Sequence, residues 1–259
     1  MTSITFIVIK FLPRFVVNQI LRIIPYCSRR KKHLSSGGIS FRRRKLKMED
    51  LTRLYCRPLP SDSPYVKPFR CHYTQGGKQK DWDMLEVHDS VAIIIFNVTR
   101  NVLIFVKQFR PAIYYSCVLP VDREEDEVDT SKYPASLGIT LEMCAGIVDK
   151  NKSLHEIARE EVLEECGYDV PITELHKIIS YRAGVGVQGS LQTMFYCEVT
   201  DEMKTAKGGG VDDEIIEVVE QSIPEVEKWI STPGPHNSPP SCLFAVMWFL
   251  LNKAEKYRK

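Results

Sequence analysis

The spacing of apolar and polar residues predicts a chain rich in β-strands after residue 48. Apolar runs that alternate or lie between turn residues predict strands over 68–75, 78–87, 91–97, 102–109, 139–145, 173–181, 192–199 and 215–220. Helical spacing predicts helices over 153–166, 223–231 and 241–256. Because strands outnumber helices, the pattern favours an α+β fold or a mixed sandwich over a doubly wound parallel sheet.

Two stretches between these elements are predicted as loops. Residues 120–138 are acidic and rich in turn residues, which indicates a long surface loop. Residues 207–210 contain three consecutive glycines and are predicted to be flexible. We therefore expect the acidic residues 212–214 that follow them to stand on a mobile loop.

Charge divides the chain into two parts. Residues 1–47 hold twelve Lys and Arg and no acid, whereas residues 48–259 hold 23 bases and 33 acids, a net charge of −10. An acidic body argues against broad nucleic-acid binding, which needs a cationic surface. It is typical of a domain that gathers carboxylates around a metal ion. The chain total of +2 hides this division into a basic extension, 1–47, and an acidic domain, 48–259.

The basic extension allows three interpretations. Residues 4–25 are apolar, and their polar positions recur every four residues, at Lys10, Arg14, Asn18 and Arg22. Such a helix would be typical of a mitochondrial presequence or of contact with a membrane surface, and its charges make it too short to span a bilayer. Alternatively, Met48 is the working start and the extension is dispensable. Eight cysteines without a C-x-x-C pair indicate reduced thiols inside the cell, so a cytoplasmic location is the first expectation.

Three carboxylates mark the most informative helix. Glu161, Glu164 and Glu165 lie three and four residues apart, so they share one face of the helix predicted over 153–166. Like charges at this spacing repel each other, and a bound divalent cation would relieve that repulsion. The alternative is a solvated acidic surface, which is the more common meaning of a charge run.

The surrounding residues resemble the Nudix box, G-x5-E-x7-R-E-U-x-E-E-x-G-U, in which U is apolar. With the first glycine at Gly146, seven of the nine defined positions agree. The agreeing residues are Gly146, Glu161, Val162, Glu164, Glu165, Gly167 and Tyr168. Lys152 stands in place of the first Glu and Glu160 in place of the Arg. We consider an ion pair of reversed polarity, a loop shift that recruits Glu156, and chance as explanations.

The resemblance to Nudix hydrolases covers nearly all of 48–259 and implies an α/β/α sandwich with mixed sheets flanked by helices. It makes Glu161 and Glu165 the first-choice metal ligands and Glu164 the next, with the backbone carbonyl of Ala145 completing the set. The implied cofactor is Mg²⁺, with Mn²⁺ as an alternative. Bound ions of this kind would neutralise a diphosphate and activate an attacking water.

The segment Val106-Lys-Gln-Phe-Arg-Pro111 resembles the V-x-Q-x-R motif of the Nudix branch that acts on ADP-ribose and nucleoside diphosphate sugars. This resemblance implies hydrolysis of a UDP-sugar such as UDP-glucose to UMP and sugar 1-phosphate. ADP-ribose hydrolysis is the alternative within the enzyme class. A catalytically inactive nucleotide-sugar binding module is the alternative outside it, and its support is the two departures from the box.

The same resemblance suggests further site residues and a quaternary state. Arg110 would bind substrate phosphate with its fork of donors, or else cap a strand end as a surface residue. Trp82 would stack on the base, or else pack in a buried sheet. Glu214 would be the general base, or else part of a solvated turn, and Gly184 and Gly186 would let the backbone approach the substrate, or else serve as turn glycines. The resemblance also implies a homodimer to which strands 68–87 contribute.

Overall fold

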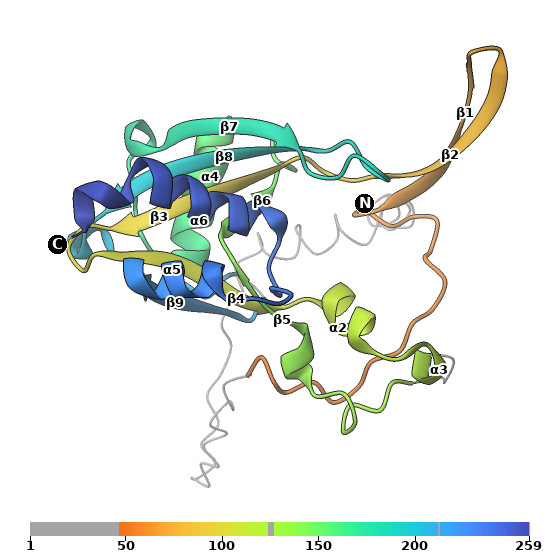
Figure 1. Cartoon of the computed structure of the whole chain (residues 1–259), viewed down its shortest axis with the longest axis horizontal. Helices are drawn as coiled ribbons and strands as arrows, with labels where there is room; N and C mark the ends of the chain where they lie inside the picture. Colours follow the sequence, from red (N-terminus) through yellow and green to blue (C-terminus); the bar gives the residue numbers. More distant parts are fainter. Residues whose placement is uncertain (1–46, 124–126, 212, 259) are drawn as a thin grey trace, which may run out of the picture. The chain divides into compact units, whose positions relative to one another are not determined.

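The computed structural model describes residues 47–123, 127–211 and 213–258, so the predicted helix over 4–25 lies outside the described residues. A seven-stranded sheet organises the described part of the chain (Figure 1). Its strands are, in chain order, β3 (Ser90–Asn97), β4 (Val102–Phe109), β5 (Ile139–Glu142), β6 (Cys144–Ile147), β7 (His176–Arg182), β8 (Leu191–Val199) and β9 (Ile216–Ser222).

The sheet is mixed and has helices on both faces. Its strand order is β5-β4-β3-β8-β7, with β6 added to β3 and β9 to β4, and only the β3–β8 pair among these strands is parallel. Alternate residues of β3 point to opposite faces, so Ile93 packs on the side of α4 (Leu154–Cys166). Ile94 packs on the side of α5 (Ile223–Ser231) and α6 (Pro240–Asn252). The predicted α/β/α sandwich with mixed strands is therefore confirmed.

Strand β3 changes its antiparallel neighbour along its length. The half that begins at Ile95 pairs with β4, and the half from Ser90 to Ile93 pairs with β6. Strand β4 in turn pairs with β5 at its far end, from Val106 onward. The candidate site uses residues from both branches of this divided pairing.

The first two strands form a separate hairpin, β1 (Lys67–Gln75) and β2 (Lys78–Glu86), as predicted. Gly76 and Gly77 make the turn with φ of +59° and +73°, a conformation that favours glycine. Every hairpin residue except Met84 is exposed. The hairpin therefore packs little of its surface against the rest of the described chain.

Two predictions between residues 111 and 147 were wrong. The single strand expected over 139–145 is broken at Met143 into β5 and β6, which pair with different strands. The stretch expected to be a surface loop over 120–138 contains α3 (Pro120–Arg123) and a 3-10 turn, Ala135–Gly138, and α2 (Pro111–Cys117) precedes it. This region buries a small core of its own, made of Tyr114, Val118, Val128 and Tyr133. Of these four residues, Val128 and Tyr133 lie in the acidic stretch, where isolated apolar residues show no periodic pattern.

The apolar run near the C-terminus forms α6, which ends at Asn252, earlier than the predicted residue 256 because a 3-10 turn follows. Its buried residues, Cys242, Ala245, Val246 and Phe249, pack against the sheet. Within the described ranges, no helix is both long enough and apolar enough to cross a membrane.

Candidate active site

Local capping fixes the position of the carboxylate helix α4. The Ser153 side chain accepts a hydrogen bond from the backbone N–H of Glu156, and the Glu156 side chain accepts one from the backbone of Ser153. The helix ends at Gly167, whose φ of +75° is left-handed and whose Cβ, if present, would lie 2.1 Å from the carbonyl oxygen of Ala206. A capping box and a glycine C-cap therefore fix the two ends of the helix. Because Glu156 is used in the cap, the proposed loop shift that recruits it is wrong.

Two carboxylates of α4 lie directly against strand β6. A Cβ at Gly146 would stand 2.0 Å from Oε1 of Glu161, so only glycine leaves room for this carboxylate. The backbone N–H of Ala145 donates to Oε2 of Glu165 at 3.0 Å. The box glycine and the two carboxylates thus form one contact surface between β6 and α4.

Burial leaves these two carboxylates poorly solvated. Glu165 is only 5% exposed, and burial raises its pKa to about 8. The pKa of Glu161 is raised to about 7, first by burial and then by the charge of Glu164. A cation beside them would favour their charged forms and lower both pKa values.

The two departures from the Nudix box form an ion pair with each other. The Lys152 ammonium contacts Oε1 of Glu160, and Lys150 lies 3.3 Å from its other oxygen. These contacts lower the pKa of Glu160, with Lys152 as the largest cause. The hypothesis of an ion pair with reversed polarity is confirmed. Arg159, one position before the expected arginine, instead binds Asp169 at 2.5 Å.

The glycine-rich loop after β8 is attached to the end of α4. The N–H groups of Gly209 and Gly210 donate to the carbonyls of Glu165 and Glu164 at 2.8 and 3.1 Å. Glycines 208–210 all have positive φ, and a Cβ at Gly210 would lie 2.5 Å from Oε2 of Glu214. The same Glu214 oxygen accepts from the N–H of residue 211 at 2.9 Å. The loop thereby brings Glu214, whose charge raises the pKa of Glu161 and Glu165, beside the α4 carboxylates.

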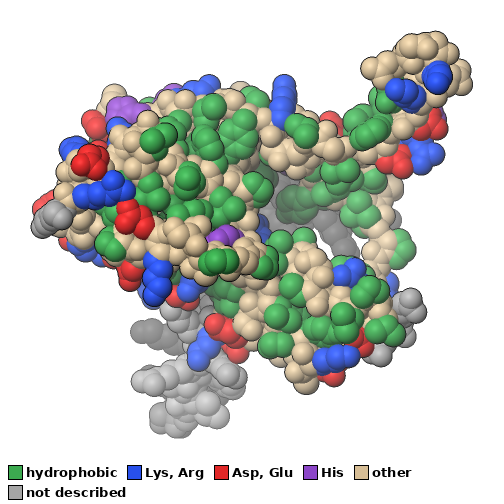
Figure 2. All heavy atoms as spheres, in the orientation of Figure 1, with side chains coloured by type: hydrophobic (Ala, Val, Ile, Leu, Met, Phe, Trp, Pro, Cys, Tyr) green, Lys and Arg blue, Asp and Glu red, His purple; other side chains and the backbone are tan. Residues whose placement is uncertain are grey.

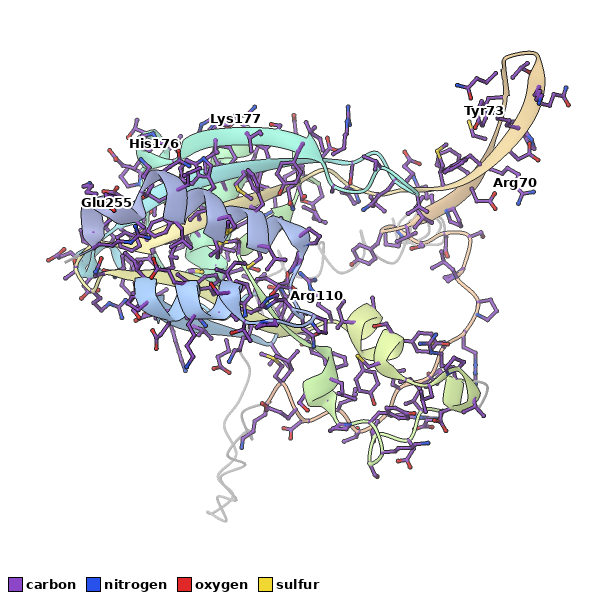
Figure 3. The ribbon with its side chains drawn as sticks, viewed as in Figure 1. Arg70, Tyr73, Arg110, His176, Lys177 and Glu255 are labelled. Atoms are coloured by element: carbon purple, nitrogen blue, oxygen red, sulfur yellow. The ribbon has the colours of Figure 1, made fainter. Side chains whose placement is uncertain are left out.

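Arg110 lies between the end of β4 and the start of α2, where Figure 3 labels it. Its Nε and Nη2 donate to the two oxygens of Glu142, each at 2.7 Å. Glu142 is 4% exposed and also accepts from the hydroxyl of Thr140 at 2.6 Å. Glu142 thus holds the guanidinium group of Arg110 in place, and Nη1 of that group has no hydrogen-bond partner among the described residues.

These groups share a cavity of about 530 Å³. It is lined by Tyr65, Ser90, Ala92, Gln108, Arg110, Glu142, Met143, Ala145, Gly146, Ile147, Glu161, Glu165, Gln192, Glu214, Pro239 and Ser241. The structure therefore brings together Arg110, Ala145, Glu161, Glu165 and Glu214, as predicted from sequence. Glu164 lies on the same helix but does not line the cavity.

Sequence reasoning missed three kinds of cavity residue. Glu142 is hidden within an apolar strand, although a lone acid in such a strand is a signal for a buried ion pair. Tyr65 is an exposed aromatic residue in an irregular segment, where no periodic pattern could reveal it. Ser90 and Gln192 are single polar residues at strand starts, which is the ordinary sequence of a strand end.

Trp82, Gly184 and Gly186 lie outside this cavity in the described chain. Trp82 is 51% exposed on β2, so the alternative of buried sheet packing is wrong for it. Its indole N–H donates to the carbonyl of Gly186 at 2.7 Å. Gly184 and Gly186 belong to the turn between β7 and β8. Base stacking by Trp82 and substrate approach at the two glycines stay predictions.

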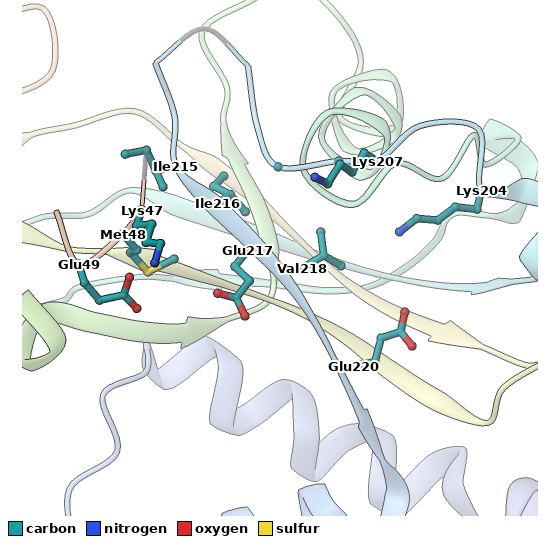
Figure 4. Close-up of a pocket in the computed structure, with 12 residues that line it drawn as sticks. Lys47, Met48, Glu49, Lys204, Lys207, Ile215, Ile216, Glu217, Val218 and Glu220 are labelled. Carbon is teal, nitrogen blue, oxygen red and sulfur yellow. The ribbon is translucent and has the colours of Figure 1, made fainter. Parts of the chain in front are cut away.

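A larger cavity, of about 720 Å³, lies along the edge strand β9 (Figure 4). Lys47, Met48, Lys207 and Glu217 are among the residues that line it. It contains none of the predicted site residues, and its acidic and basic side chains are interspersed. We assign the candidate site to the smaller cavity, because that one holds the buried carboxylates and Arg110.

The donor set of the smaller cavity fits a divalent cation that prefers oxygen ligands. Glu161 and Glu165 supply a partly buried and a buried carboxylate, and carboxylate oxygens are ligands that such a cation prefers. Among the described residues, no three His, Cys, Asp or Glu side chains are grouped so that they could hold a metal ion alone. Two carboxylates, the Ala145 carbonyl and substrate oxygens would therefore have to share the ligation.

Comparison with known proteins identifies relatives over most of this chain. The chain is 40% identical over 202 residues to uridine diphosphate glucose pyrophosphatase NUDT14 of Mus musculus, which covers 74% of this chain and 90% of that protein. The Bos taurus protein of the same name is 39% identical over 198 residues, and the match covers 72% of this chain and 89% of that protein. GDP-mannose pyrophosphatase of Salmonella arizonae is 34% identical over 138 residues, and the match covers 52% of this chain and 62% of that protein. No protein-family model matches the chain.

Proposed function

The chain belongs to the Nudix hydrolase family, and on that premise we propose that it hydrolyses the diphosphate bond of a nucleoside diphosphate sugar. UDP-glucose, cleaved to UMP and glucose 1-phosphate, is the first-choice substrate. The cavity that holds Glu161, Glu165 and Arg110 together is the observation that carries this proposal. The names of the mammalian relatives support UDP-glucose, and the name of the bacterial relative supports nucleotide sugars as a class.

Mg²⁺ is the proposed cofactor, with Mn²⁺ as a substitute. Mg²⁺ is commonly held by one or two carboxylates together with substrate phosphates, which suits the pair Glu161 and Glu165. When bound, it would neutralise the diphosphate and lower the pKa of an attacking water. Glu164 on the same helix stays the next candidate ligand, and its charge raises the pKa of Glu161.

The protein's own groups would orient the substrate and accept the proton. Arg110, held by Glu142, would direct Nη1 at a phosphate oxygen of the substrate. Glu214 would accept the proton of the attacking water, because its carboxylate lines the cavity and remains largely exposed to solvent.

The test is a comparison of kcat/KM for UDP-glucose, ADP-ribose and GDP-mannose with Mg²⁺, since substrate preference is the ratio of these values. We expect UDP-glucose to have the highest value. A higher value for ADP-ribose would replace the proposed substrate, and no turnover of any of the three would favour an inactive binding module. The Lys152–Glu160 ion pair argues against that module, because both departures from the box are accommodated together.

We further propose that the hairpin β1–β2 assembles the chain into a homodimer. One face of it carries Phe69, Cys71 and Tyr73 opposite Met84 and Trp82. The other face carries the paired charges Arg70–Asp83 and His72–Asp81. Figure 2 shows hydrophobic and charged side chains together on this arm.

A two-stranded hairpin is marginally stable alone, so a second copy of the chain would supply the missing cover for its apolar face. Sedimentation of the chain and of a Phe69→Ser/Trp82→Ser variant would test this, with a monomeric variant expected.

The role of residues 1–47 stays a prediction. We propose a cytoplasmic location, with mitochondrial import and membrane contact through 4–25 as the alternatives. Imaging the tagged full chain beside a chain that starts at Met48 would separate them. An identical cytoplasmic distribution of the two would favour a dispensable extension.

A further inference from the structure

One wall of the candidate site carries no charge and is tied together by side-chain hydrogen bonds. The phenol of Tyr181 on β7 donates to Oε1 of Gln192 on β8 at 2.6 Å. Nε2 of Gln192 donates to Oγ of Ser90 on β3 at 3.0 Å. Ser241, in the first turn of α6, adds a further uncharged side chain to the same lining. Ser90, Gln192 and Ser241 line the cavity, and Tyr181 stands behind them.

The direction of these hydrogen bonds decides what the wall offers to a ligand. Tyr181 uses its only O–H hydrogen on Gln192, which fixes the amide with its nitrogen toward Ser90. Ser90 accepts from that nitrogen and so keeps its own hydrogen to donate. The amide nitrogen of Gln192 keeps a second hydrogen as well. The wall therefore presents hydrogen-bond donors to the cavity at Ser90 and Gln192.

Packing holds this arrangement in place. Gln192 stands opposite Ser90 in the parallel β3–β8 register and opposite Tyr181 in the antiparallel β7–β8 register. The Tyr181 ring meets Phe244 of α6 edge to face, with 5.9 Å between centroids. The donors are thus set by three strands and one helix before any ligand arrives, which reduces the entropy lost on binding.

The wall begins next to the strand residue that contacts the carboxylates. Ser90 pairs with Ile147 on β6, and the preceding residue, Gly146, contacts Glu161. If the diphosphate of the substrate lies at Glu161 and Glu165, the group bonded directly to a phosphate will reach Ser90 first. In a nucleoside diphosphate sugar that group is a sugar ring, since the base is separated from the phosphate by the ribose.

We propose that Ser90 and Gln192 determine specificity by donating hydrogen bonds to hydroxyl oxygens of a sugar ring attached to the diphosphate, and that Tyr181 is the residue that positions them. This inference rests on the proposed function, because it takes the diphosphate to lie at the carboxylates. The ring is either the terminal hexose or the ribose of the nucleoside, and both offer the same acceptor chemistry. Uncharged donors at this wall select for sugar hydroxyls and leave the recognition of charge to Arg110.

The experiment combines side-chain deletion with hydroxyl deletion. The wild type, Ser90→Ala, Gln192→Met and Tyr181→Phe are assayed with UDP-glucose and with analogues that each lack one hydroxyl, either of the glucose or of the ribose. We expect Ser90→Ala and Gln192→Met each to lower kcat/KM for UDP-glucose about three- to tenfold, the effect of one uncharged hydrogen bond. For the analogue that lacks the bonded hydroxyl, the same substitution should cause no further loss.

The analogue for which the substitution causes no further loss lacks the bonded hydroxyl, and the position of that hydroxyl shows whether the ring is glucose or ribose. Tyr181→Phe should show a smaller loss with the same dependence on the analogue, which a purely structural role would not give. Ser180→Ala is the matched control, because that hydroxyl binds Thr193 at 2.9 Å on the same two strands and does not line the cavity. Equal losses with every analogue would overturn the inference while wild-type turnover of UDP-glucose still supported the proposed function. Circular dichroism and Tm confirm that each variant is folded.

Discussion

The two ends of the candidate cavity are built in different ways. At one end Glu161 and Glu165 come from a single helix turn, are held against β6, and have raised pKa values. At the other end Ser90 and Gln192 come from strands far apart in the sequence, carry no charge, and are joined by a hydrogen bond that Tyr181 orients. The charged end requires an external partner to be stable in its ionised form, whereas the neutral end is organised without one. Under the proposed function, the first end would carry the chemistry and the second the selection of the substrate.

The largest expected effect is at the charged end. Glu165→Gln keeps the shape of the side chain, so its amide oxygen can still accept from the N–H of Ala145. Losing the negative charge should lower kcat about a hundredfold or more, as does the removal of one electrostatic stabiliser from an active site. Steady-state kinetics with saturating Mg²⁺ would measure this loss. Unchanged turnover would contradict the assignment of Glu165 as a metal ligand.

A smaller loss is expected at Arg110, which lines the same cavity and is bonded to Glu142. Arg110→Lys keeps the charge but cannot bind both oxygens of Glu142 and a phosphate in one plane. We expect KM for UDP-glucose to rise about tenfold with little change in kcat. Arg123→Lys is the control, because Arg123 binds backbone carbonyls outside the cavity. A fall in kcat alone would mean that Arg110 acts in the chemical step and not in binding.

The raised pKa values predict an unusual dependence of stability on pH in the metal-free protein. Between about pH 4.5 and the folded-state values of about 7 and 8, the folded chain binds more protons at Glu161 and Glu165 than the unfolded chain does. The contribution of these two groups to the free energy of unfolding is therefore highest below pH 4.5, and it falls as the pH rises through 8.

Thermal unfolding in EDTA should accordingly show Tm falling between pH 6 and 8.5, by about 3 °C or more. Glu165→Gln should flatten this fall, and Mg²⁺ should raise Tm more at pH 8.5 than at pH 6. An equal effect of Mg²⁺ at both values would show that the ion does not act on the buried carboxylates.

The smallest effect is expected at the reversed ion pair, which supports the charged end from outside. Lys152 and Glu160 are partly exposed, so Lys152→Glu or Glu160→Lys should each lower the free energy of unfolding by only about 0.5 kcal/mol, which chemical denaturation can detect. The double reversal recreates a pair of opposite charges and should recover most of the loss. A double variant no more stable than the single ones would show that the pair contributes nothing.

The same contrast explains how much the sequence could predict. The charged end lies close together in the sequence, with helical spacing, a capping serine and a glycine stop, so its shared helix face could be predicted, and the reversed ion pair was one of three explanations considered for Lys152 and Glu160. Arg110 and Glu214 were also identified, although the attachment of the Glu214 loop to the end of α4 was not, because backbone hydrogen bonds of a loop leave no residue pattern.

The neutral end could not be predicted for a physical reason. Ser90 and Gln192 are 102 residues apart, and only the parallel β3–β8 register makes them neighbours. Single polar residues at strand starts are common, so neither attracts notice in the sequence. The small core around Tyr114 was missed similarly, because two of its residues, Val128 and Tyr133, are isolated apolar residues in an acidic segment. Local patterns thus predicted most of the elements and the grouping of the α4 carboxylates, while contacts between distant strands determined the rest.

The most direct test of the proposed hydrolysis is ³¹P NMR of UDP-glucose incubated with the full chain and Mg²⁺, with the Glu165→Gln variant alongside. The account predicts that the diphosphate resonances of UDP-glucose are replaced by those of UMP and glucose 1-phosphate in equal amounts, at a rate at least about a hundredfold lower for the variant. The appearance of UDP and free glucose, or equal rates for the two proteins, would contradict it.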